Sequence, residues 1–99
     1  MSAVDRQRML YELAEAVLGG QRTRISAQLG QERAAPVPDQ ARIEELQAHS
    51  TAVYLEFHAL WSDDEPAVEA FLRKYAKDPA RLEQAIQHVR DVCADRGSS

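Results

Sequence analysis

Residues 39–62 read DQARIEELQAHSTAVYLEFHALWS, and this stretch predicts a long amphipathic helix. With Ile43 at position a of a heptad, positions a and d hold Ile43, Leu46, Ser50, Val53, Phe57 and Leu60. Five of these six side chains are apolar, which is typical of a helix packed lengthwise on other helices. Tyr54 and Trp61 fall at position e, where we expect them to widen the inward stripe.

The opposite side of this helix carries a second stripe, whose residues recur at spacings of four, three and four. The stripe consists of Ala48, Ala52, Leu55 and Ala59. Small side chains at these positions would let a second backbone approach closely, so we interpret them as partner-binding residues. Either the chain's other helices or a second molecule would cover them. The alternative is a solvated face, where Ala favours helix and Leu55 is a single exposed apolar residue.

The remaining sequence predicts helices on both sides of this stretch. Pro36 and Pro38 separate it from a first helix, because residues before proline avoid the helical conformation. Asp78-Pro79 is typical of a helix start, and so is the segment 62–66, SDDEP. The expected fold class is all-α, an antiparallel bundle of three to four helices around the long 39–62 helix. As one domain, the chain should have helices at about residues 3–32, 39–62, 65–77 and 79–95.

The first helix contains the pair Gly19-Gly20, at which it could end or continue. Glycine often ends a helix in the left-handed conformation. However, Ile25 and Leu29 extend the apolar stripe of Leu18 beyond the glycines, and two glycines cost a helix only about 2 kcal/mol. We therefore favour one continuous helix. A second short helix that begins near Thr23 is the alternative.

Composition restricts the class of protein. The 99 residues, 44% of them hydrophobic, suffice for one core but leave little chain to frame a deep catalytic cleft. The N-terminal residues lack the apolar run of a signal peptide, and the single Cys93 excludes an internal disulfide framework, so we expect a cytoplasmic protein. Ten of the twelve basic residues are Arg, which favours a bacterial source with a GC-rich genome.

Negative charge is concentrated in the middle of the chain. Residues 34–65 contain one Arg and seven acidic residues, whereas the segments before and after each carry a net charge of +1. An acidic helix disfavours general affinity for nucleic acid, which requires a basic face. It suits a basic protein partner, or simply solubility.

A nucleic-acid-binding regulator is one alternative function. Residues Ile25–Gly30, ISAQLG, resemble the first half of a helix-turn-helix, and Arg22 and Arg24 would contact phosphates. The recognition helix should follow directly, but Pro36 and Pro38 occupy that stretch. The next helix is also acidic, so this reading is the weaker one.

A small-ligand or metal binder is the other alternative, with a site in the bundle core near His49, Ser50, Tyr54 and Trp61. No two His residues have the helical spacing of a local metal pair, and Cys93 fits a core position. The sequence therefore predicts no catalytic residue, no cofactor and no metal ligand. The expected function is a non-catalytic protein–protein interaction module, namely a small subunit, adaptor or inhibitor, with a homodimer as one form it could take.

Overall fold

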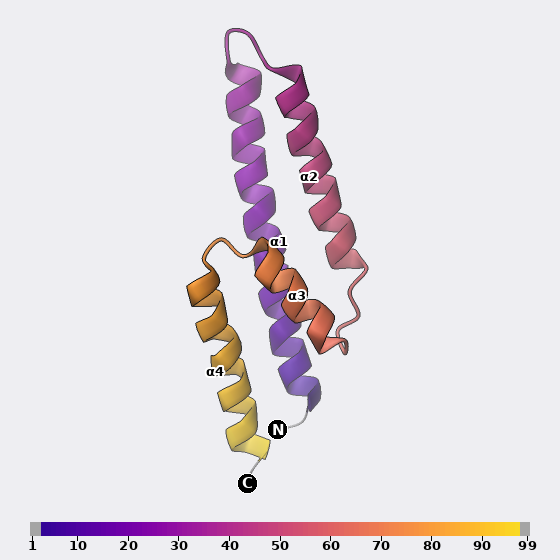
Figure 1. Cartoon of the computed structure of the whole chain (residues 1–99), viewed down its shortest axis with the longest axis vertical. Helices are drawn as coiled ribbons and strands as arrows, with labels where there is room; N and C mark the ends of the chain where they lie inside the picture. The colour runs from indigo at the N-terminus through magenta and orange to yellow at the C-terminus, as the bar shows by residue number, and fades with distance from the viewer. Residues whose placement is uncertain (1–2, 98–99) are drawn as a thin grey trace.

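A computed structural model describes residues 3–97, which form an elongated all-α structure of 62 × 24 × 14 Å (Figure 1). Over that range the helices are α1 (Ala3–Ala34), α2 (Gln40–His58), α3 (Glu65–Tyr75) and α4 (Pro79–Gly97). The prediction of an all-α helical bundle is confirmed. None of the described helices contains a stretch long and apolar enough to cross a bilayer.

The helix at the centre of the bundle is α1, and not the 39–62 helix as predicted. α1 contacts each of the other three helices, whereas α2 contacts only α1 and α3. With 32 residues, α1 is about 48 Å long, so different partners can pack along different parts of it. It passes through Gly19-Gly20 as one helix, which is the continuous alternative. Figure 1 shows α2 antiparallel to the C-terminal half of α1, which we call the distal half. α3 and α4 lie beside the N-terminal half of α1, which we call the proximal half (Figure 1).

The second helix is shorter than its sequence pattern predicts. Its start is capped as expected, because the Asp39 carboxylate accepts a hydrogen bond from the backbone N–H of Arg42 at 3.2 Å. It ends at His58, whereas the predicted helix extends to Ser62. Asp64 is the N-cap of α3, so the residues between His58 and Asp64 must reverse the chain.

The third helix ends at Tyr75, two residues before the predicted end at Lys77. Asp78 accepts a hydrogen bond from the backbone N–H of Arg81 at 3.2 Å and starts α4. Pro79 follows at the first position of that helix and disfavours a helical conformation at Asp78. The residues between the two helices therefore form a tight turn.

Side chains from all four helices form the main core, in the proximal half of the molecule. It includes Leu10, Ala14 and Leu18 of α1, Val53 and Phe57 of α2, Val68, Phe71, Leu72 and Tyr75 of α3, and Leu82, Ile86, Val89 and Cys93 of α4. Ile25, Ile43 and Leu46 are also buried, but they lie outside this cluster. The distal half of the molecule is thus a two-helix arm with a thinner core.

The predicted burial of the inward stripe of α2 is confirmed at four positions, Ile43, Leu46, Val53 and Phe57. The two aromatic residues expected to widen it are exposed, Tyr54 by 45% and Trp61 by 76%. One step along a helix rotates the side chain by about 100°, so Tyr54 leaves the side that α1 and α3 cover. Trp61 lies beyond the end of α2, where the heptad position no longer fixes its direction.

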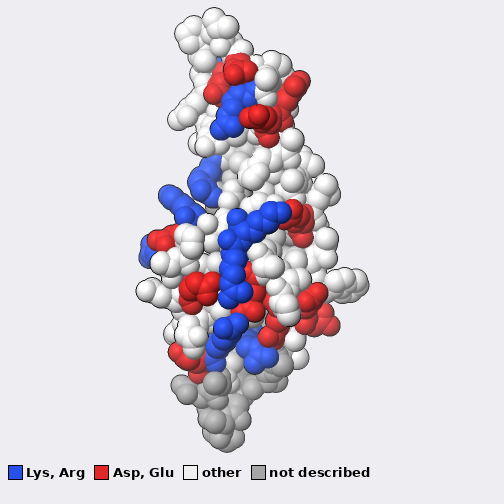
Figure 2. Space-filling view, in the orientation of Figure 1, with Lys and Arg blue, Asp and Glu red and all other residues white. Residues whose placement is uncertain are grey.

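Ion pairs connect α3 to each of the other helices. The pairs are Arg6–Glu65 with α1, Lys74–Glu56 with α2, and Arg73–Glu83 and Arg90–Glu69 with α4. In Figure 2, basic side chains form a line down the middle of the face shown, with acidic side chains beside them. Each of these pairs has at least one exposed side chain, and such pairs stabilise only weakly, so they set the position of α3 more than they hold the fold together.

The ion pair between Glu56 and Lys74 should make stability depend on pH. Lys74 Nζ lies 2.7 Å from Glu56 Oε1, and this hydrogen bond holds the pKa of Glu56 below its ordinary value. A carboxyl whose pKa is lowered by folding stabilises the protein above its unfolded pKa, and the stabilisation is lost as pH falls through the folded pKa.

We therefore expect Glu56→Gln to lower the urea midpoint slightly at pH 7. As pH falls through the lowered pKa of Glu56, the difference between the variant and the wild type should shrink and then disappear. Glu44→Gln is the matched control, because Glu44 is exposed on the same helix and forms no ion pair with a described residue. An effect of Glu56→Gln that stays equal as pH falls would contradict this account.

Candidate functional site

The outer face of α2, which we define as Ala48, Ala52 and Leu55 of the helix with its C-cap residue Ala59, is exposed. Leu55 is 59% exposed although it is a large apolar residue. The described helices of the chain therefore do not cover this face, and the intramolecular explanation of the stripe is wrong. A solvated face and a surface for a second molecule remain as the two interpretations.

Other exposed apolar residues lie near this face. Tyr54, Leu55 and Trp61 fall within eight residues at the end of α2 and are exposed by 45%, 59% and 76%. The Tyr54 ring packs against the ring of His58 at a tilt of 45°, with centroids 4.2 Å apart. Clusters of exposed apolar side chains mark interaction surfaces more often than single ones do.

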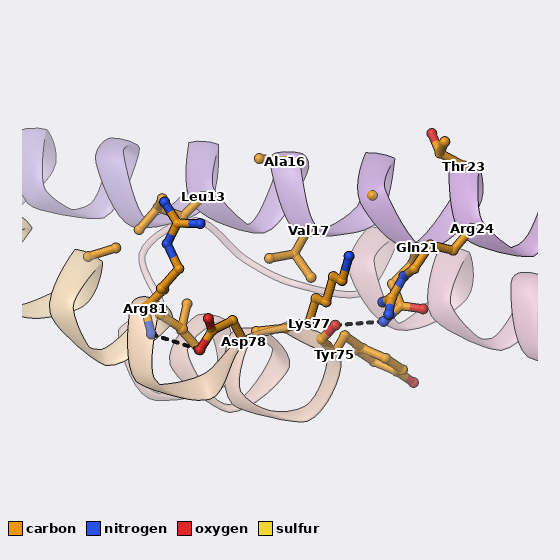
Figure 3. Close-up of a pocket in the computed structure, with 14 residues that line it drawn as sticks. Leu13, Ala16, Val17, Gln21, Thr23, Arg24, Tyr75, Lys77, Asp78 and Arg81 are labelled. Atoms are coloured by element: carbon orange, nitrogen blue, oxygen red, sulfur yellow. Dashed lines mark hydrogen bonds between the residues drawn. The ribbon is translucent and has the colours of Figure 1, made fainter.

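A second candidate surface, which we call the α1 groove, lies between α1 and the turn from α3 to α4 (Figure 3). It has a volume of about 630 Å³. Apolar and small side chains line most of it, among them Leu13, Ala16 and Val17 of α1, Ala76 of the turn, and Leu82 and Ala85 of α4. Gly20 also lines it, and a Cβ added there would meet nothing within 4 Å.

Two hydrogen bonds fix the walls of the α1 groove. Gln21 Nε2 donates to the backbone carbonyl of Tyr75 at 2.6 Å, which connects the end of α3 to α1. The Asp78 carboxylate accepts from the backbone N–H of Arg81, which starts α4 at the other side of the turn (Figure 3). The groove is therefore built by ordered backbone and not by surface side chains alone.

Three basic side chains, Arg24, Lys77 and Arg81, also line the α1 groove. Six other cations of the described residues form ion pairs: Arg6, Arg8, Arg42, Arg73, Lys74 and Arg90. Among residues 4–93, whose side chains the structure describes, no carboxylate pairs with the three groove cations, and the same holds for the exposed Arg22 and Arg33 of α1. The groove thus has a positive rim above an apolar floor.

The predicted helix-turn-helix segment does not form a turn. Ile25–Gly30 lies inside the unbroken α1, and Ile25 is buried. Arg22 and Arg24 are both exposed, but Arg24 lines the α1 groove and Arg22 does not. The structural basis for that nucleic-acid interpretation is therefore wrong.

The structure does not bring the proposed core ligand site together. His49 is exposed and lies against Tyr75, with ring centroids 6.1 Å apart, while Tyr54 lies against His58 and Trp61 is exposed. Ser50 is half-buried. Among the described residues, no group of three or more His, Cys, Asp or Glu side chains could hold a metal ion.

Sequence reasoning missed the α1 groove, because its residues come from two segments with different local roles. Leu13 and Val17 belong to the apolar face of the first helix, and the sequence pattern places Lys77 at the C-terminal end of the predicted 65–77 helix. One signal was present: Ala16, Gly20 and Thr23 recur at spacings of four and three, with no large side chain. Such a stripe leaves space beside a helix.

The outer face of α2 and the α1 groove are the two candidate sites of this chain. Comparison of the chain with models of protein families, with curated proteins and with solved structures finds no match.

Proposed function

We propose that this protein is a non-catalytic helical interaction module, a small subunit, adaptor or inhibitor, that binds its partner through the outer face of α2. The observation that carries the proposal is the exposure of Leu55, 59%, in the middle of a stripe of alanines. A leucine flanked by small residues offers a projecting apolar side chain with little side-chain bulk beside it. A partner helix can bury such a surface with its backbone close to α2.

A second copy of the chain is the first partner to consider. Two outer faces related by a two-fold axis perpendicular to α2 would pack antiparallel, with Leu55 of each copy against the alanines of the other. Full burial of one leucine side chain contributes about 1.5–3 kcal/mol, and the two-fold axis doubles this contribution. A contact of this kind is small, so we expect association at high protein concentration.

Leu55→Glu should abolish this association. A charged carboxylate in the contact would have to be buried without a partner, which costs several kcal/mol. Sedimentation equilibrium over a range of concentrations should show a monomer–dimer equilibrium for the wild type and only monomer for the variant. Circular dichroism should show the same helix content, since the side chain is exposed in the monomer.

Val37→Glu is the matched control, because Val37 is also a large exposed apolar residue, at 86%, but lies in the loop between α1 and α2. It should associate like the wild type. A wild type that stays strictly monomeric would reject the homodimer. If native partners that co-purify with the wild type also co-purify with Leu55→Glu, the outer face of α2 is not the contact surface.

A further inference from the structure

The α1 groove is separate from the outer face of α2 and combines two properties that single out one class of ligand. Its floor is apolar, and its rim carries Arg24, Lys77 and Arg81 without described carboxylate partners. We propose that the α1 groove binds an amphipathic anion, a single unbranched apolar chain that ends in a carboxylate. This inference goes beyond the proposed interaction function and does not depend on it.

The size and lining of the groove favour a small molecule with an apolar body. A volume of about 630 Å³ lies within the range of small-molecule sites, roughly 300–1,000 Å³. Leu13, Val17 and Leu82 supply apolar contacts along the floor, and Ala16 and Gly20 leave space beside α1. A simple inorganic anion would leave this floor uncovered, so the chain of the ligand is as important as its charge.

The charge of the rim favours an acidic head group. In Figure 3, the side chains of Lys77 and Arg81 extend from the turn toward α1, and Arg24 extends from α1 toward the turn. Guanidinium groups match the two oxygens of a carboxylate. The groove also contains an acid, Asp78, but its carboxylate caps α4, and the positive end of that helix faces the same region. The rim therefore keeps a net positive charge.

Decanoate is the probe that tests the site, in a titration of the isotope-labelled full chain followed by amide chemical shifts. At low ionic strength and below the micelle concentration, we expect saturable shifts centred on Val17, Gly20, Gln21 and Lys77. Decanol carries the same chain without charge, and acetate carries the charge without the chain. Each should bind at least about tenfold more weakly, because each loses one of the two kinds of contact.

Two glycine variants test the location. Leucine at position 20 would extend into the groove, whereas position 19 does not line it, and an added Cβ at either position meets nothing within 4 Å. Gly20→Leu should weaken decanoate binding at least about tenfold, and Gly19→Leu should bind it like the wild type. Both variants should remain folded, so a loss of binding by Gly20→Leu alone identifies the site.

A charge variant tests the head group. Lys77→Gln with Arg81→Gln should weaken decanoate roughly fivefold and leave decanol unchanged, as expected for exposed ion pairs. Saturable binding that Gly20→Leu leaves intact would overturn the proposal, and so would shifts centred on Tyr54, Leu55 and Trp61. If the wild type does not bind decanoate, the proposal is overturned as well, even if an acidic peptide occupies the groove instead.

Discussion

Leu72→Ala should lower the free energy of unfolding by about 2–5 kcal/mol. Leu72 is fully buried, with 0% exposure, in a cluster to which all four helices contribute. Its removal costs the transfer of the leucine side chain from water and leaves a cavity that four packed helices cannot easily close. A domain of this size has a total stability of about 5–15 kcal/mol, so this one change removes a large share of it.

Urea denaturation followed by circular dichroism measures this loss. Leu55→Ala is the matched control, since it removes the same atoms from a side chain that is 59% exposed, and its effect should stay within about 0.5 kcal/mol. Equal losses for the two variants would mean that Leu55 is buried in solution, as it would be in a stable dimer. The control would then need repeating at concentrations where the protein is monomeric.

The sequence was most informative where the signals are local. The Asp39 carboxylate caps α2 and the Asp78 carboxylate caps α4, and both caps require only a side chain and a backbone N–H three residues later. The apolar spacing of Ile43, Leu46 and Val53 likewise reports the side of a helix that becomes buried. These features do not depend on where the other helices lie.

The arrangement of the helices could not be read in the same way. An apolar stripe shows that a helix packs, but not against which partner, so the long 39–62 stretch was mistaken for the centre that α1 occupies. The prediction that Tyr54 and Trp61 are buried was wrong for the same reason, because an aromatic residue next to a core position is buried only if a third helix covers it. The α1 groove depends on how the α3–α4 turn rests on α1, where the hydrogen bond from Gln21 to Tyr75 adds to the packing of α3 and α4 on α1.

The double variant Gly19→Ala, Gly20→Ala should raise the free energy of unfolding by about 2 kcal/mol. Both glycines lie in the middle of the continuous α1, and an added Cβ at either position meets nothing within 4 Å. Alanine is favoured over glycine in a helix interior by about 0.8–1.0 kcal/mol per residue, because it restricts the unfolded chain. Urea denaturation measures the gain.

Gly30→Ala separates this effect from a general benefit of alanine. Gly30 is equally open, but it lies four residues before the end of α1, in the two-helix arm, where fraying reduces the gain from a better helix former. We therefore expect a smaller increase than for either central glycine. If the double variant gained no stability, α1 would have to be bent or interrupted at Gly19-Gly20 in solution. The α1 groove, which depends on a straight helix from Leu13 to Arg24, would then lose one of its walls.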